Sequence, residues 1–396
     1  MMSSGEMELM VDNRQLPVGW EIKKLGEVCT LQRGFDLPKG QREEGDYLLI
    51  SSSGCIDTHT EAKSFAPGVV TGRSGSIGSV FFITEDFWPL NTTLYVKDFH
   101  GNDPRFIFYL LNKFDLKRFA SGVGVPTLNR NSVHSELVII PSSIIEQKRI
   151  VAIADEAFEG IDRAIRNTEK NLSNARELFE SYLNSIFTQK GDGWVKSKLN
   201  EVCEKITDGT HQTPKYFETG FVFLSSRNVT TGAINWDKVK YIDDAQHITM
   251  QKRVSPRLYD ILLAKNGTTG VAALVDKDID FDIYVSLALL RPLPVILPKF
   301  MLHFVNSPVA KEQFNKRLKG IGVPNLHLEE IREVTICYPQ ELRLQEGIII
   351  KIDEMRSQIL RLENIYRQKI AALKELKQSI LQKAFTGELT AHKGEK

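Results

Sequence analysis

Residues 72–78 and 265–270 are two copies of a glycine-rich loop whose residue types suit binding to phosphates and to the edges of bases. Small residues let the backbone approach a ligand closely, and its amides can hold phosphate. Ser, Thr, Asn and Arg side chains can also hydrogen-bond to base edges. The alternative is a tight glycine hairpin whose hydroxyl groups satisfy its own backbone. The candidate DNA-binding residues of this loop are Arg73, Ser74, Ser76, Lys265, Asn266, Thr268 and Thr269.

Residues 122–129 and 320–327 are two copies of a second glycine-rich loop, and each follows a short basic run. A basic edge that leads into exposed backbone suits contact with phosphates. A glycine helix cap followed by solvated lysines fits the pattern equally well, so both interpretations stay open. The candidates of this second loop are Lys117, Arg118, Thr127, Asn129, Lys316, Arg317 and Asn325.

Two further polar segments in the second half of the chain are weaker candidates. Thr210 and His211 belong to the segment DGTHQTP, and Arg227 and Asn228 follow an apolar run. Side chains of these types can contact bases. A single histidine is nevertheless more often structural than a ligand.

The motifs of common nucleotide-using and metal-using enzymes are absent. The chain has no G-x-x-x-x-G-K-[ST] loop, no H-E-x-x-H pair and no Asn/Asp-Pro-Pro-aromatic tetrapeptide of the amino-methyltransferases. Its four cysteines form no C-x-x-C pair, and none of its eight histidines lies at ligand spacing from a cysteine. Scattered Asp and Glu residues always permit a nuclease, but we expect no catalytic residue and no metal site.

The composition indicates an intracellular protein with little overall charge. The 396 residues carry 51 Lys and Arg against 50 Asp and Glu, so a DNA-binding surface would have to be local. The widely spaced cysteines indicate reduced thiols, and no apolar run has the length of a membrane span. We expect a cytoplasmic protein with no membrane contact. Residues 1–15 lack a signal-peptide pattern and are expected to form a disordered leader.

The chain contains one unit written twice. Gly19-Trp20 recurs as Gly193-Trp194, and the strand-like run LLISS from Leu48 recurs as VFLSS from Val222. The two glycine-rich loops follow in the same order in both copies. Additional residues in the second copy are expected to lie in loops.

Each copy ends in a segment that predicts a long helix. Between residues 146 and 189, apolar or small residues recur every three or four positions without a proline, which marks one face of a helix roughly 66 Å long at about 1.5 Å per residue. Residues from 345 onward repeat the pattern, so that Gln147 matches Gln345 and Phe187 matches Phe385. Because so long an apolar face needs a partner, we predict that the two helices form a coiled coil.

These patterns predict an α+β protein with two tandem mixed α/β domains, each followed by a long helix. In the first domain, strands are expected at 47–51, 78–84, 92–96 and 137–140, and an amphipathic helix at 104–119. The counterpart of that helix is expected at 298–306, with a further helix to 318. The predicted boundaries are 1–15 for the leader, 16–145 and 191–344 for the two domains, 146–190 and 345–387 for the two helices, and 388–396 for the tail.

The duplicated motifs resemble those of the specificity subunits of type I restriction–modification systems over nearly the whole chain. Each motif is weak alone, but their order and duplication are specific. One departure is Leu344, which stands where the family usually has Glu before Gln345, and it changes a single surface residue. The motifs are GW at each globular start, RGFDLP from Arg33, GRSGSIG from Gly72, WPLNTTLY from Trp88, DGTH from Asp208 and the helix starts at Glu146-Gln147 and Gln345.

The resemblance implies a DNA-recognition protein without catalysis of its own. Such subunits carry two target recognition domains, each reading one half of a split, asymmetric sequence in double-stranded DNA. Their two helices pack antiparallel with pseudo-two-fold symmetry and would set the unread spacer. Two DNA methyltransferase subunits would dock, one on each half, and motor-nuclease subunits would join for restriction. S-adenosylmethionine, ATP and Mg would belong to those partners, with no cofactor bound by this chain.

Two other functions are compatible with the sequence. One is the recognition subunit of a related restriction enzyme that cuts beside its site. The other is a coiled-coil scaffold whose duplicated domains bind protein or glycan. No residue pattern in the loops specifies which bases are read, or how long the spacer is.

Overall fold

The computed structural model divides into two compact units, each of which contains one globular part and segments of both long helices. Unit 1 comprises Met1–Thr168 and Gln368–Lys396, and unit 2 comprises Glu169–Arg367. The expected leader at 1–15 and most of the expected tail lie outside the described residues. The structure describes residues 16–122, 124, 126–189, 191–229, 232–267, 269–318 and 325–390.

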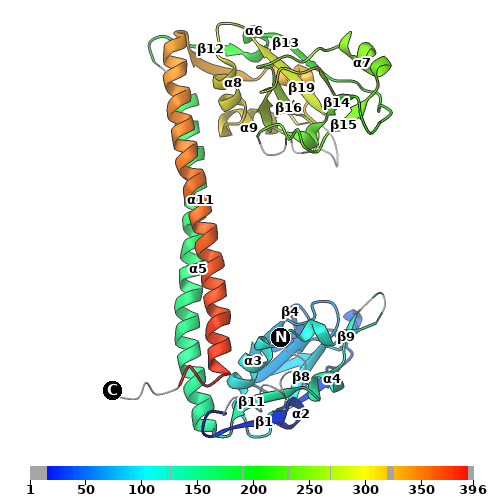
Figure 1. Cartoon of the computed structure of the whole chain (residues 1–396), viewed down its shortest axis with the longest axis vertical. Coiled ribbons are helices and arrows are strands. Elements are labelled where there is room, and N and C mark those ends of the chain that lie inside the picture. The colour runs from blue at the N-terminus through cyan, green and yellow to red at the C-terminus, as the bar shows by residue number, and fades with distance from the viewer. Residues whose placement is uncertain are drawn as a thin grey trace. The chain divides into compact units, whose positions relative to one another are not determined.

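The globular part of unit 1 is built on small sheets of short strands (Figure 1). Four of its strands form the antiparallel sheet β2-β8-β5-β6, and three form the mixed sheet β4-β3-β7, in which β3 and β7 are parallel. The pairs β1-β11 and β9-β10 stand apart. The strands are β1 (Trp20–Lys24), β2 (Thr30–Arg33), β3 (Tyr47–Ser51), β4 (Gly54–His59), β5 (Gly68–Gly72), β6 (Val80–Ile83), β7 (Phe87–Pro89), β8 (Thr93–Asp98), β9 (Ala120–Ser121), β10 (Thr127–Leu128) and β11 (Leu137–Pro141).

Helix α3 covers the four-stranded sheet of unit 1, where it contacts β5 and β6. The single helix predicted at 104–119 is wrong in its second part. Phe114 has extended backbone and ends α3, and the Asp115 side chain then accepts a hydrogen bond from the Lys117 backbone to start a separate 3-10 turn, Leu116–Phe119. The α-helices of this globular part are α2 (Leu25–Val28), α3 (Pro104–Lys113) and α4 (Arg130–His134).

The globular part of unit 2 repeats this plan. Its strand orders β13-β19-β16-β17, β15-β14-β18 and β12-β20 match β2-β8-β5-β6, β4-β3-β7 and β1-β11 of unit 1. Helix α8 contacts β17 and β19, as α3 covers the sheet of unit 1 (Figure 1). The elements are β12 (Trp194–Lys198), α6 (Leu199–Val202), β13 (Cys203–Asp208), β14 (Phe221–Leu224), β15 (Lys240–Ile242), α7 (Asp244–Gln251), β16 (Ile261–Ala264), β17 (Ala272–Leu274), β18 (Phe281–Ile283), β19 (Leu287–Pro292), α8 (Pro298–Val305), α9 (Pro308–Asn315), α10 (Leu328–Arg332) and β20 (Thr335–Pro339).

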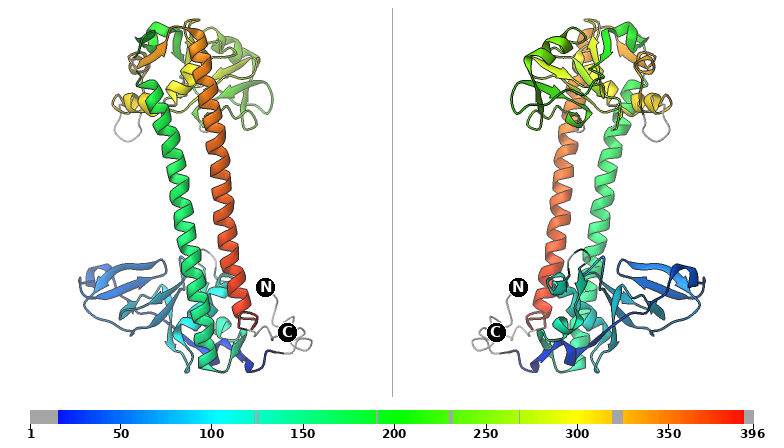
Figure 2. Two further views of the ribbon diagram at one scale, coloured as in Figure 1. Left: turned by 90° about the vertical axis from the view of Figure 1, so that its left-hand side faces the viewer. Right: turned by 90° about the vertical axis from the view of Figure 1, so that its right-hand side faces the viewer.

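The two long helices pack antiparallel, which confirms the predicted fold class. In unit 1, Lys377 Nζ of α11 lies 2.8 Å from Asp162 Oδ2 of α5, and in unit 2 Arg176 Nε of α5 lies 2.9 Å from Glu363 Oε1 of α11. Later positions on α5 therefore face earlier positions on α11. Both views of Figure 2 show the helices alongside each other within each unit. The helices are α5 (Ile144–Phe187) and α11 (Leu342–Ala384).

Each globular core receives the last turn of a long helix. In unit 2 the ring of Phe187, at the end of α5, packs 5.4 Å from the ring of Phe300 of α8. In unit 1 the ring of Phe385, just after α11, packs 5.1 Å from the ring of Phe106 of α3. Burying a Phe side chain stabilises by roughly 1.5–3 kcal/mol. The two matched phenylalanines therefore fasten the helix ends to the cores.

A buried glutamine holds the start of each long helix to its globular part. The side-chain oxygen of Gln147 accepts a hydrogen bond from the Asp103 backbone (2.9 Å), and its amide group donates to the last carbonyl of β11 (3.1 Å). Gln345 makes the same two bonds, with the Leu297 backbone (2.8 Å) and the last carbonyl of β20 (2.9 Å). The Gln147–Gln345 match in the sequence thus has a structural cause.

Candidate nucleic-acid interface

The two glycine-rich loops predicted separately in the first half of the chain meet in the structure of unit 1. Ser74, from the first loop, forms a β-bridge with Thr127 from the second. The backbone nitrogen of Leu128 donates a hydrogen bond to the carbonyl oxygen of Arg73 over 2.8 Å. The candidates of both loops therefore belong to one surface.

The same pairing recurs in unit 2. Asn266 forms a β-bridge with Asn325, and the backbone nitrogen of Leu326 donates to the carbonyl oxygen of Lys265 over 2.9 Å. The sequence relates the first loops of the two copies to each other, and likewise the second loops. The structure adds that, within each unit, the first and second loops pair with each other.

The strand registers assign equivalent positions in the two units. Arg33 ends β2 and faces the second residue of β8, and Asp208 ends β13 and faces the second residue of β19. Arg73 directly follows β5, and Lys265 directly follows β16. Arg33 and Asp208 thus occupy one position of the shared fold, and Arg73 and Lys265 occupy another.

In unit 1 these positions line a cavity of about 430 Å³ beside the paired loops. Three of its lining side chains are arginines, and among the described residues that line it none is acidic. Three predicted residues, Arg73, Thr127 and Asn129, line it, whereas Arg33 and Arg130 were not predicted. The lining residues are Arg33, Arg73, Leu94, Ser121, Thr127, Leu128, Asn129, Arg130 and Asn131.

Local hydrogen bonds orient the cavity side chains of unit 1. Arg73 Nη1 donates to the carbonyl oxygen of Asn91 over 3.3 Å, which fixes one edge of its guanidinium group. Arg33 Nη2 lies 3.3 Å from Asp36 Oδ1, and the Arg33 side chain is 50% exposed. Asn129 Oδ1 accepts from the Asn131 backbone over 3.0 Å and caps α4. The side-chain amide of Asn129 still has donors to offer to a ligand.

In unit 2 the equivalent positions form a buried ion pair. Lys265 Nζ lies 2.9 Å from Asp208 Oδ2, and the two side chains are 7% and 3% exposed. Arg253 Nη2 donates to Asp208 Oδ1 over 2.6 Å, and His211 Nε2 lies 3.2 Å from the same oxygen. Burial alone would raise the pKa of Asp208, but the hydrogen bonds from Lys265 first and then Arg253 hold that pKa below its ordinary value. The charge of the predicted candidate Lys265 is therefore neutralised inside the protein.

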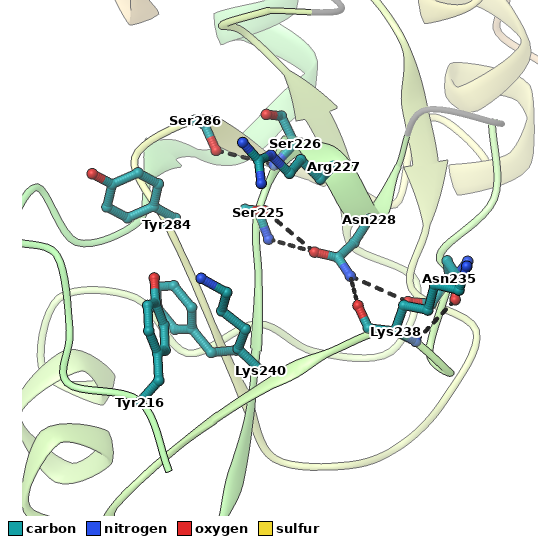
Figure 3. Close-up of a pocket in the computed structure, with 11 residues that line it drawn as sticks. Tyr216, Ser225, Ser226, Arg227, Asn228, Asn235, Lys238, Lys240, Tyr284 and Ser286 are labelled. Carbon is teal, nitrogen blue, oxygen red and sulfur yellow. Dashed lines mark hydrogen bonds between the residues drawn. The ribbon is translucent and has the colours of Figure 1, made fainter. Parts of the chain in front are cut away.

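Unit 2 has a different cavity, of about 570 Å³, between β14, β15 and the turn before β19. Figure 3 shows Tyr216, Tyr284 and Lys240 on one side of it and Asn228 on the other. Lys240 Nζ lies 3.8 Å from the centre of the Tyr216 ring, a cation–π contact. The lining residues are Tyr216, Phe223, Ser225, Ser226, Arg227, Asn228, Asn235, Lys238, Lys240, Tyr284 and Ser286.

The two predicted residues of this cavity differ in availability. Asn228 is buried, its oxygen accepts from the Ser225 backbone (2.9 Å), and its amide donates to the carbonyls of Asn235 and Lys238 (3.3 and 3.0 Å) (Figure 3). These bonds hold the cavity wall together. Arg227, the residue before it, is exposed and can reach an outside ligand.

Comparison with protein-family models identifies the family. The model described as "Type I restriction modification DNA specificity domain" matches residues 17–172 and again residues 191–375, so it covers both copies of the repeat. The chain belongs to this family. It is a type I specificity subunit, the part of the system that carries DNA specificity and not its catalysis.

Curated relatives are distant specificity subunits. The EcoKI specificity subunit of Escherichia coli K12 is 21% identical over 95% of this chain and 90% of that protein. The EcoBI specificity subunit of Escherichia coli is 25% identical over 50% of this chain and 43% of that protein. The MjaVIII specificity subunit of Methanocaldococcus jannaschii is 22% identical over 72% of this chain and 70% of that protein.

Solved structures share the fold of this specificity subunit. A chain from a study of complex assembly and conformational transition in a type I R-M system matches 95% of this chain and 100% of its own length, with a TM-score of 0.75 and 20% identity. The HsdS subunit from Thermoanaerobacter tengcongensis matches 95% of this chain and 99% of its own length, with a TM-score of 0.54 and 19% identity. At these identities the likeness establishes the fold.

The other predicted residues of unit 1 lie near its paired loops. Ser76 and Lys117 are exposed, so both can be reached by a ligand. Arg118 forms an ion pair with Glu136, whose side chain is 9% exposed. The guanidinium group of Arg118 also lies 4.5 Å from the centre of the Phe119 ring. Its position is thus set by the protein.

The other predicted residues of unit 2 are held mostly by local contacts. Thr210 forms a β-bridge with Tyr284 at the edge of the unit 2 cavity, and Thr269 Oγ1 donates to a carbonyl of its own turn over 3.4 Å. Lys316 makes an exposed ion pair with a glutamate of α9 (2.5 Å), and Arg317 Nη1 donates to a carbonyl of the same helix (3.0 Å). Thr268 lies outside the described residues.

The described His, Cys, Asp and Glu side chains of this specificity subunit include no group of three or more that could hold a metal ion. None of its described helices combines the length and apolar character needed to cross a membrane.

Proposed function

We propose that this specificity subunit recognises a split, asymmetric target in double-stranded DNA, with one half-site read by each globular part. The observation that carries the proposal is the combination of a shared strand register with different side chains at matched positions. Identical readers would favour a symmetric target. At one matched position unit 1 has Arg33 and unit 2 has Asp208. The cavity of unit 1 is lined by arginines, whereas that of unit 2 is lined by aromatic residues and lysines. These differences favour two different half-sites.

We assign DNA contact to the paired loops and the two cavities. Arginine, lysine and backbone amides would position the duplex by its phosphates, and Ser, Thr, Asn and His side chains would contact base edges. We assign DNA contact to all the predicted residues except two: Lys265 is paired inside the protein, and the side-chain amide of Asn228 is hydrogen-bonded to the cavity wall. We also assign DNA contact to five residues that were not predicted: Arg33, Arg130, Tyr216, Lys240 and Tyr284.

The division of labour along the chain is part of the proposal. Residues 16–145 and 191–344 would be the two DNA readers. Residues 146–190 and 345–387 would be the helices whose length sets the unread spacer between the half-sites. The continuous lengths of α5 and α11, 44 and 43 residues, support a ruler of this kind.

The remaining parts of the system would come from partners. Two methyltransferase subunits would dock on this chain and use S-adenosylmethionine to methylate an adenine in each half-site, after flipping it out of the duplex. Motor-nuclease subunits would supply ATP-driven, Mg-dependent restriction. The whole would work in the cytoplasm, where its DNA is.

DNA binding by the purified complex of this chain with its methyltransferase tests the proposal. Duplexes recovered from a random library should share two conserved blocks separated by a fixed unconserved spacer. Arg227→Ala should weaken the preference for one block only. Random recovered sequences from a complex of the expected mass would instead favour a scaffold without DNA specificity.

A further inference from the structure

The two units carry opposite charge at one position of the shared fold. Arg33 ends β2 in unit 1, and Asp208 ends β13 in unit 2 at the same register of the four-stranded sheet. The neighbouring position is basic in both, Arg73 and Lys265. Unit 1 therefore has two cations where unit 2 has a cation and an anion.

The cations of unit 1 converge on one cavity. Arg33, Arg73 and Arg130 all line the space of about 430 Å³, and none of its described lining residues is acidic. Asp36, which pairs with Arg33, is not among the lining residues; its Oδ1 lies 3.3 Å from Arg33 Nη2, and its side chain is 68% exposed. A single weak and solvated ion pair does not neutralise three guanidinium groups. The cavity is therefore set up for an anion.

The same place in unit 2 is closed to an anion. Asp208 holds Lys265 in a pair whose side chains are 3% and 7% exposed, so the ammonium group is already neutralised. Arg253 adds a second hydrogen bond to the same carboxylate. An incoming phosphate would meet a carboxylate and would have to break a buried pair, which is costly.

We propose that the Arg33–Arg73–Arg130 cavity binds a backbone phosphate of the first half-site, and that unit 2 holds no phosphate at the matching position. This rests on the proposed function, since the phosphate belongs to the DNA target. Three arginines that line one space suit the negative charge and the tetrahedrally arranged oxygens of a phosphate. Reading a base instead takes a single guanidinium group that donates two hydrogen bonds to one base edge. Arg73, tied to the Asn91 carbonyl at one edge, has its remaining N–H groups for the cavity.

Salt dependence of binding measures phosphate contacts directly. The complex of this chain with its methyltransferase is titrated onto its split target duplex at several salt concentrations. Arg33→Gln and Arg73→Gln should each lower the slope of log affinity against log salt, by about one at most, because the cavity holds a single phosphate. Lys39→Gln, the same charge change at an exposed residue of unit 1 outside the cavity, should leave the slope unchanged.

Methylation of the target separates phosphate from base contact. The methylated motif should be the same in Arg33→Gln, Arg73→Gln and the original protein, since a phosphate contact carries no sequence information. A relaxed base in the first half-site would overturn the proposal in favour of base reading. An unchanged salt slope in both variants would also overturn it.

A neutral DNA backbone tests the site without any protein variant. Methylphosphonate placed at successive positions along the first half-site should weaken binding of the original complex at one position, and Arg33→Gln should reduce that effect. The same methylphosphonate scan along the second half-site should give the same binding pattern for the original complex and for Arg253→Gln. Uniform tolerance in both scans would overturn the phosphate site while leaving the split target intact. A complex with no split target would overturn this inference together with the proposed function.

Discussion

Replacing Asp208 with alanine should destabilise unit 2 far more than loss of an exposed carboxylate would. Its partner Lys265 is 2.9 Å away and the two side chains are 3% and 7% exposed. The substitution leaves an ammonium group buried without a counter-charge, and breaking such a pair costs about 3–5 kcal/mol of unfolding free energy. Arg253 and His211 are 49% and 62% exposed, so water can solvate them after the change.

A double variant separates the charge effect from the loss of packing. Adding Lys265→Met to Asp208→Ala removes the stranded ammonium group and keeps a long side chain, so most of the lost stability should return. The matched control is Glu333→Ala, which breaks an ion pair with Lys198 (2.6 Å) whose side chains are 47% and 51% exposed. This control should change the stability little, because both groups are already solvated.

Hydrogen–deuterium exchange in increasing urea is the suitable assay, since peptides from each unit report their own unfolding. Peptides of β13 and β16 should lose protection in Asp208→Ala, and peptides of β2 and β5 should not. Equal losses in the single and the double variant would refute the stranded-charge argument. So would a loss in Asp208→Ala no larger than in Glu333→Ala.

Acid should erase the advantage that Asp208 provides. Burial raises its pKa, but the hydrogen bonds from Lys265 and Arg253 outweigh burial and hold the folded-state pKa below the ordinary value of 3.8. A carboxyl group with a lowered pKa stabilises the fold above its ordinary pKa, and that stabilisation is lost as the pH falls through the folded-state value. The stability difference between the original protein and Asp208→Ala should therefore be full at neutral pH and shrink in acid below 3.8.

Three further predictions follow from the structure. Gln345→Leu leaves the half-buried Leu297 backbone amide without its partner and should cost about 1–3 kcal/mol, seen as faster proteolysis at the start of α11. Burial lowers the pKa of His303 to about 4 despite the nearby Asp353, so unit 2 should lose stability as the pH falls from 6.5 towards 4, and His303→Gln should flatten that part of the curve of urea midpoint against pH. Inserting four residues, about one turn, into α5 after residue 169 and into α11 after residue 369 should change the spacer and leave both half-sites intact in the methylated motif; an unchanged spacer would remove the ruler role.

The long helices could be predicted because their signal is local and repeated. Apolar residues every three or four positions define one helix face wherever the chain ends up. Their starts were less predictable. Helix α5 begins at Ile144 and α11 at Leu342, before the predicted 146 and 345, because the first turn of each is largely exposed and breaks the apolar pattern. The strands at Tyr47–Ser51 and Leu137–Pro141 could also be predicted, because a short run of strand-forming residues is a local signal too.

The site could be predicted only in parts, because its geometry depends on contacts between distant segments. The loops at Arg73 and Leu128 carried separate signals, and no local pattern indicated that they pair. Lys265 was predicted to face DNA because it matches Arg73, but its burial depends on Asp208, which comes from another strand. That partner was visible in the sequence only as a polar loop residue.

Of the residues that line the unit 2 cavity, only Arg227 and Asn228 were predicted, because its walls come from separate segments of the chain. Tyr216 precedes β14, Lys240 begins β15 and Tyr284 follows β18. In the sequence, Tyr216 and Lys240 lie on either side of β14, and an aromatic and a basic residue so placed are a weak signal for nucleic-acid binding. The signal becomes informative once the strand register places Tyr284 at the same cavity.

Long-read sequencing of genomic DNA from cells that express this chain with its methyltransferase tests the central claim most directly. The account predicts methylated adenine in a split motif, one on each strand, with two unlike half-sites and a fixed spacer. A symmetric motif would contradict the claim that the two globular parts read unlike half-sites. A complex that assembles and binds S-adenosylmethionine but adds no new methylation would contradict the DNA-recognition role itself.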